Sequence, residues 1–147
     1  MLEESEQVEI EEKIVNIPPL AGMIILKLVA WSDRPEEREN DLSDILRIID
    51  HYFDHNFDEI VEYHHDIFGE DEFDQILISA EVLGRKARKI LAKSEVLESR
   101  IINVLEQNLK SEFQSIIARD WATKKDWEIE YALKVIKSFY TGIQTLE

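Results

Sequence analysis

Apolar residues recur at intervals of three and four along most of this chain, and this spacing limits the fold more than any other feature of the sequence. The clearest case is the segment 41–53, whose apolar residues fall on one face of a helix. They are Leu42, Ile45, Leu46, Ile49 and Phe53. Four glycines and three prolines in 147 residues are few, which favours long regular elements over a loop-rich β fold. The sequence therefore predicts a mainly all-α fold.

The same spacing predicts five to six helices with short connections, arranged as a single bundle-like domain. The expected ranges are 20–31, 41–53, 57–68, 73–92, 96–118 and a last helix that runs to the C-terminus. Helix 20–31 is apolar on nearly every side and is expected to be central. The last helix is expected to begin at a capping box formed by Thr123 and Asp126.

The N-terminal region has a different character. Residues 1–12 are rich in glutamate, and we expect them to be a flexible acidic N-terminus that precedes a helical domain of residues 13–147. Residues 13–17 are largely β-branched and end at Pro18, which predicts one short strand. A strand needs a partner, and no second strand is predicted within this chain.

The chain is strongly acidic, with 17 Lys and Arg against 32 Asp and Glu and a formal net charge of −15. Such a surface repels a phosphate backbone at long range, so we expect no binding to duplex DNA. The absence of cysteine excludes disulfides, thiolate catalysis and zinc–sulfur sites. No signal-peptide pattern opens the chain, and its longest apolar stretch, 23–31, is too short to span a bilayer. We therefore expect a cytoplasmic protein that does not bind a membrane.

The glycines exclude several kinds of active site. The residues that follow them are methionine, glutamate, arginine and isoleucine, so neither Gly-x-Gly nor Gly-Lys-Ser/Thr can form a loop that cradles phosphates. Gly-x-Ser-x-Gly is also absent, which excludes the nucleophile turn of the α/β-hydrolases.

Two histidines have the spacing of a metal-binding pair. His51 and His55 are four residues apart, which can direct two imidazoles toward one ion. Tyr52 stands where a helical zinc protease has its glutamate, and the expected helix ends at this point. Histidines near a helix C-terminus are also favourable through the helix dipole. We therefore predict no metal site here, and a metal-dependent enzyme is only a third interpretation.

A basic cluster interrupts the acidic sequence between residues 82 and 94. Arg85, Arg88 and Lys89 share one face of the expected helix and could contact phosphates of RNA or of a nucleotide. The alternative is a solvated face whose positive charges suit the C-terminal end of a helix.

Lys27 lies within an otherwise apolar helix. Burying an ammonium group without a partner is costly, so Lys27 must reach solvent or meet a carboxylate. Asp41 and Asp44 are three residues apart on the next helix and are its natural partners. Such an ion pair is either a structural clamp or part of a site.

Residues 14–50 resemble a segment of the nucleotidyltransferase-like proteins, namely the abortive-infection toxin type and its uncharacterised bacterial relatives. The residues that carry the resemblance are Ile17-Pro18, Leu26-Lys27-Leu28-x-Ala30-Trp31-x-Asp33-Arg34, Arg38 and Asp41-Leu42-x-Asp44-Ile45. The resemblance implies that Lys27, Arg34, Asp41 and Asp44 are accessory residues of a nucleotide site. It also implies that these helices follow a catalytic sheet and lean over its nucleotide pocket.

This chain lacks the catalytic motifs of that family. Members of the family carry a Gly-Ser turn and an Asp-x-Asp strand that hold magnesium beside a nucleoside triphosphate, and neither motif occurs here. We therefore expect a C-terminal helical portion that is inactive alone and needs a catalytic half, with strand 13–17 as the end of the missing sheet. No cofactor is expected for this chain alone, and magnesium and nucleoside triphosphate are expected once that half is present. The alternative is a stand-alone acidic interaction module that binds a partner protein or forms a homo-oligomer.

Overall fold

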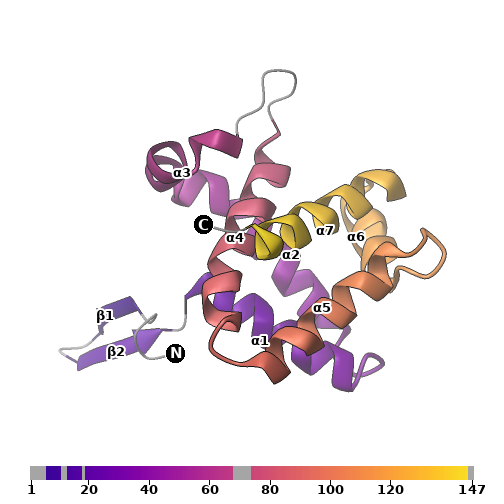
Figure 1. Ribbon diagram of the computed structural model, residues 1–147, viewed down its shortest axis with the longest axis horizontal. Coiled ribbons are helices and arrows are strands. Elements are labelled where there is room, and N and C mark those ends of the chain that lie inside the picture. Colours follow the sequence, from indigo (N-terminus) through magenta and orange to yellow (C-terminus); the bar gives the residue numbers. More distant parts are fainter. Residues whose placement is uncertain (1–5, 11–12, 18, 68–73, 146–147) are drawn as a thin grey trace.

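The computed structural model describes residues 6–10, 13–17, 19–67 and 74–145. Seven α-helices hold most of these residues, so the all-α class is confirmed, with one helix more than the upper number expected. The helices are α1 (Leu20–Asp33), α2 (Glu39–His55), α3 (Phe57–Tyr63), α4 (Gln75–Leu91), α5 (Glu95–Leu109), α6 (Ile116–Lys125) and α7 (Ile129–Gln144), and a single 3₁₀ turn, η2, is His65–Ile67 (Figure 1).

An antiparallel hairpin precedes the helices. Its strands are β1 (Glu6–Ile10) and β2 (Lys13–Ile17), and Val8 is paired with Val15. The predicted strand at residues 13–17 is therefore confirmed, but the expectation that it has no partner in this chain is wrong. The segment expected as a flexible acidic N-terminus, residues 1–12, contains β1 in its described part. The alternation of polar and apolar residues from Gln7 to Ile10 is a short β pattern that is easily missed among so many glutamates.

Helix α1 is buried on one face only. Ala21, Ile24 and Leu28 are almost fully buried, whereas the side chain of Leu26 is 54% exposed. The helix contacts α2, α4 and α5, in keeping with the expected central position, but the face that carries Leu26 is open. Figure 1 shows the hairpin extending from the N-terminal end of α1, away from the other helices.

The segment 96–118, expected as one helix, is two helices. The side chain of Asn108 is buried, and its amide donates to the carbonyl of Val104 while its Oδ1 accepts from the backbone N–H of Ile117. Ser115 is the N-cap of α6, where its Oγ accepts from the N–H of Ala118. These two polar side chains satisfy the backbone groups that a break in the helix exposes.

The start of α7 also differs from the prediction. Thr123 lies inside α6 and donates to the carbonyl of Arg119, so it caps no helix. Asp126 ends α6 in the left-handed region, with φ of 55°, and α7 begins after Glu128. Asp and Asn tolerate this conformation better than most residues, which explains why the aspartate ends one helix and does not start the next.

Helices α4 and α7 form the most extensive contact in the described fold. They cross where Gly84 faces Gly142, and a Cβ added to Gly84 would lie 2.9 Å from the Cα of Gly142. This close approach fixes the centre of the bundle, because no larger residue fits at the crossing. Helices α1 and α2 pack beside this pair, and their outward surface carries Lys27 and its partners.

Candidate functional site

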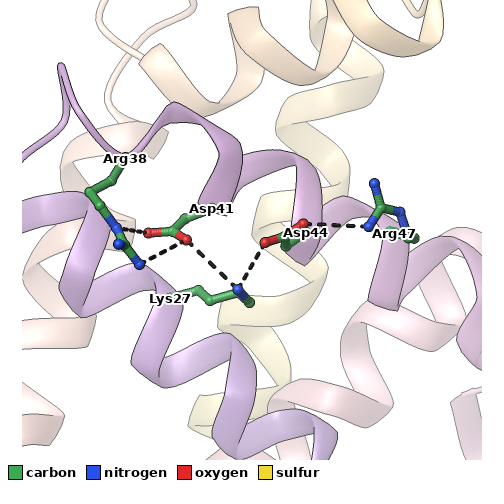
Figure 2. A network of polar contacts seen from close by, with 5 residues as sticks. All are labelled: Lys27, Arg38, Asp41, Asp44 and Arg47. Carbon is green, nitrogen blue, oxygen red and sulfur yellow. Dashed lines mark hydrogen bonds and ion pairs between the residues drawn. The ribbon is translucent and has the colours of Figure 1, made fainter.

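Lys27 extends from α1 toward α2 and lies between two carboxylates (Figure 2). Its Nζ donates to Oδ2 of Asp44 at 2.8 Å and lies 3.7 Å from Oδ1 of Asp41. The two aspartates are one turn apart on α2 and therefore face the same side. The pairing predicted from the sequence is confirmed.

Asp41 is the most deeply buried member of this group. Its side chain is only 6% exposed, and a carboxylate at such a position needs strong partners. Arg38 supplies them with two hydrogen bonds, from Nε to Oδ2 at 2.7 Å and from Nη2 to Oδ1 at 3.2 Å. Such a bidentate contact fixes the orientation of the carboxylate as well as neutralising it.

Asp44 lies nearer the surface and has two cationic neighbours. Its side chain is 34% exposed, and its Oδ1 is 3.5 Å from Nη1 of Arg47. The hydrogen bond from Lys27 is the main reason why the pKa of Asp44 lies below its ordinary value, and burial opposes this effect only in part. Asp44 is therefore a carboxylate at neutral pH and stays paired with Lys27.

The network of Figure 2 holds three cations and two carboxylates, namely Lys27, Arg38 and Arg47 with Asp41 and Asp44. An excess of positive charge at one place stands out in a chain whose net charge is −15. An ammonium group has three N–H donors, and the side chain of Lys27 is 25% exposed. The contact with Asp44 is a hydrogen bond, whereas Asp41, at 3.7 Å, contributes an ion pair, so the ammonium group keeps donor capacity for a ligand.

Arg34 lies outside this network. Its side chain is 72% exposed, and its ion pair is with Glu37 in the turn between α1 and α2, at 3.6 Å. Of the four accessory residues that the resemblance implies, the structure therefore brings together Lys27, Asp41 and Asp44. The arginine that contacts Asp41 is Arg38, which the resemblance includes but which was not expected in the site.

The basic cluster of α4 forms contacts within the protein. Arg85 binds Asp66 through both terminal nitrogens, at 3.0 and 2.7 Å, and its side chain is 12% exposed. Arg88 donates to the backbone carbonyl of Ile143 at 2.8 Å, which ties α4 to the end of α7. Lys89 is exposed on the same helix. Arg85 and Arg88 thus connect elements of the fold.

Two further groups beside Arg85 have shifted pKa values. Nδ1 of His64 lies 3.3 Å from Nη1 of Arg85, and burial, followed by the charge of Arg85, lowers the pKa of His64. Burial raises the pKa of Glu81, and the nearby Arg85 opposes that shift.

Lys86 forms an ion pair with Glu59 of α3 and lies over the ring of Tyr52, 5.9 Å from its centroid. The ion pairs of Arg85 with Asp66 and of Lys86 with Glu59 thus attach η2 and α3 to α4.

Neither the histidine pair nor the paired aspartates fit a metal ion. The rings of His51 and His55 have centroids 6.4 Å apart, and both residues lie on the exposed side of α2. Within the described ranges no group of three or more His, Cys, Asp or Glu residues is placed to hold a metal. Asp41 and Asp44 are engaged by Lys27 and Arg38, so they do not offer the open set of oxygen ligands that magnesium requires.

The two tryptophans of the last third of the chain serve packing. Trp121 is 4% exposed and its Nε1 donates to the carbonyl of Leu42 at 2.9 Å, which joins α6 to α2. Trp127 is half-buried and meets the ring of Tyr131 edge to face, with centroids 4.9 Å apart. Both tryptophans therefore contribute to packing within the fold.

Arg47 is the site residue that sequence reasoning missed. It lies three residues after Asp44 on α2, and this spacing alone could have indicated the contact.

In the part of the chain that the structure describes, no helix has the length and apolar character needed to cross a membrane. Comparison of the chain with models of known protein families, with curated proteins and with solved structures found no match.

Proposed function

We propose that this chain is the helical domain of a nucleotidyltransferase-like protein, in which Lys27 contacts the phosphates of a nucleotide. The observation that carries the proposal is the position of Lys27, held 2.8 Å from Asp44 and 3.7 Å from Asp41 on the surface formed by α1 and α2. The aspartates orient the ammonium group, and its exposed side faces the ligand. The order of these residues in the sequence supports the same interpretation.

In this proposal the chain alone does not catalyse nucleotide transfer. The Gly-Ser and Asp-x-Asp motifs are absent from its sequence, and the two aspartates of the site are engaged by cations. A catalytic half must therefore supply the carboxylates that hold magnesium. Because β2 pairs with β1, an unpaired strand no longer supports the proposal, which rests on the Lys27 network and on the resemblance.

Calorimetry with ATP, CTP, GTP and UTP in the presence of magnesium tests the proposal. We expect saturable binding of at least one nucleotide that is lost in Lys27→Ala. The matched control is Lys137→Ala, which removes an exposed cation of α7 without touching the network and should leave the affinity unchanged. Circular dichroism establishes that both variants are folded. The absence of binding for all four nucleotides would contradict the proposal.

A second candidate, the stand-alone interaction module, is favoured by apolar side chains that the described surface exposes. Leu26 of α1 is 54% exposed, and Phe57 and Tyr63 of α3 are 49% and 67% exposed. Exposed apolar groups of this size are common at protein interfaces. Sedimentation velocity, together with the calorimetry described above, distinguishes the candidates. A dimer that shows no heat of binding with any nucleotide supports the module, and a monomer that binds nucleotide supports the first proposal.

A further inference from the structure

An open groove lies between α2 and α6, next to the Lys27 network. Arg47 of α2 and Lys124 and Lys125 of α6 line it, together with Ser43, and Leu46 forms part of its wall. Arg47 belongs to both places, because it lines the groove and also contacts Asp44. The groove thus adjoins the Lys27 network through Arg47.

The lining of this groove is basic, in contrast to the chain as a whole. Three cationic side chains line it, and Asp50 is the one carboxylate among its lining residues. A histidine, His51, and the hydroxyl of Ser43 add two further polar groups. Cations from two helices that line one groove together with a hydroxyl are the kind of donor set that binds phosphate oxygens.

The cations of the groove are more accessible than those of α4. The side chains of Arg47, Lys124 and Lys125 are 69%, 37% and 33% exposed, against 12% for Arg85. Their present partners are also partly exposed, so these ion pairs are weak and can exchange. Lys125 binds Asp50 at 2.7 Å, and Lys124 binds Asp120 at 2.9 Å and also contacts Ser43.

We propose that the groove between α2 and α6 binds a phosphate group through Arg47, Lys124 and Lys125, with Ser43 as an additional donor. The phosphate belongs to a nucleoside triphosphate or to the backbone of an RNA strand, and the test separates these two sources. The proposal deepens the function proposed above, and rests on it, by assigning a second phosphate contact beside Lys27. On binding, the two lysines turn from Asp120 and Asp50 toward the phosphate oxygens while the guanidinium of Arg47 closes the opposite side.

The test measures binding of three probes to the purified chain. Inorganic tripolyphosphate and ATP are titrated by calorimetry, and a fluorescently labelled single-stranded RNA of ten nucleotides is titrated by anisotropy. The variant is Lys124→Gln/Lys125→Gln. The matched control is Lys134→Gln/Lys137→Gln, which removes two exposed lysines of α7 and the same charge. Arg47→Gln serves as a second variant on the other wall of the groove.

We expect tripolyphosphate and at least one of the other probes to bind, and the α6 variant to weaken this binding by about tenfold or more, since phosphate contacts depend on the cations that make them. Arg47→Gln should weaken binding of the probes as well. The affinity of the α7 control should stay within about twofold of the wild type, because its two lysines do not line the groove. If ATP binds more tightly than RNA, the phosphate that the groove binds belongs to a nucleotide. If RNA binds more tightly than ATP, that phosphate belongs to an RNA strand.

Three outcomes would overturn the inference: no binding of any probe, equal weakening in the control, or no weakening in either groove variant. The Lys27→Ala variant keeps this result separate from the proposed function. Tripolyphosphate binding that survives Lys27→Ala but is lost in the α6 variant supports the groove even where nucleotide binding at Lys27 fails. Nucleotide binding that is lost only in Lys27→Ala leaves the function in place and removes the groove.

Discussion

Lys27 crosses from an apolar helix to the two carboxylates of α2, and its replacement measures what this contact contributes to stability. Lys27→Met keeps the apolar stem but leaves Asp44 with Arg47 alone and Asp41 with Arg38 alone. We expect the free energy of unfolding to fall by about 1–2 kcal/mol, less than for a fully buried pair because Lys27 and Asp44 are partly exposed.

Urea denaturation of Lys27→Met, read by circular dichroism, provides this measurement. Arg34→Met is the matched control, because Arg34 is 72% exposed and its partner is a surface glutamate. Its effect should stay within about 0.5 kcal/mol. Equal losses in the two variants would show that Lys27 and its carboxylates form no more than a surface contact.

The contribution of Lys27 should also depend on pH. The folded pKa of Asp44 lies below its ordinary value of 3.8, chiefly because of the hydrogen bond from Lys27. A carboxylate with a lowered folded pKa stabilises the fold above its unfolded pKa, and this contribution is lost as the pH falls through the folded pKa. The stability difference between wild type and Lys27→Met should therefore be constant from pH 7 to about 5 and should shrink below pH 4. A difference that does not decrease below pH 4 would contradict the assignment of the contact to an ionised Asp44.

At the scale of residues, the sequence could predict which groups meet but not all of their partners. Lys27 had to find a carboxylate because it interrupts an apolar helix, and two aspartates one turn apart were available. The choice between Arg34 and Arg38 depends on how the turn after α1 is built, which no local pattern specifies. Arg38 reaches Asp41 because it immediately precedes α2, whereas Arg34 points toward Glu37.

The crossing of α4 and α7 makes a prediction about elements. In Gly84→Ala the new methyl group would overlap the carbonyl oxygen of Phe139, and the helices would have to separate. We expect the free energy of unfolding to fall by about 3 kcal/mol, at the upper end for overpacking, because backbone and not a flexible side chain must move. Lys89→Ala, on the exposed face of the same helix, is the control, and thermal unfolding of both variants gives the comparison. A normal melting temperature for Gly84→Ala would show that the two helices do not cross here.

Helix α3 and η2 are attached to the bundle mainly by polar contacts. Ile60 is the buried residue of α3, and Arg85 and Lys86 of α4 hold Asp66 and Glu59. Arg85→Gln should therefore loosen this segment while the core stays folded. The rate of amide hydrogen exchange should increase by about tenfold in residues 57–67, because a loss of about 1.4 kcal/mol in local stability changes the opening equilibrium by that factor. The exchange rate in α7 should remain unchanged. Faster exchange throughout the molecule, or an unchanged exchange rate in residues 57–67, would contradict the described attachment.

Helix boundaries were harder to predict than the helices themselves. The apolar spacing of α2 and α4 identified both helices, because each buries one continuous face. The break between α5 and α6 depends on the contacts of Asn108 and Ser115, which join backbone groups on both sides of it. The end of α6 depends on the left-handed conformation of Asp126. Neither feature has a periodic signal in the sequence.

For the molecule as a whole, the sequence determined the class of fold but not its assembly. Apolar periodicity and few glycines sufficed for an all-α prediction. The contact of Gly84 with Gly142 joins helices far apart in the chain, and only tertiary packing brings them together. The hairpin shows a similar limit, since β2 was predicted from its β-branched residues, whereas the short alternation in β1 is hard to recognise without its pairing with β2.

The function proposed for the molecule depends on the surface where α1 and α2 present Lys27. The most direct test is an NMR titration of the isotope-labelled chain with magnesium and the four nucleoside triphosphates, followed through backbone amide shifts. We expect saturable shifts at Lys27 and its neighbours in α1 and at residues 38–47, and the shifts in α1 should disappear in Lys27→Ala. Unchanged spectra at millimolar nucleotide, or shifts confined to the α4 cluster around Arg85, would contradict the account.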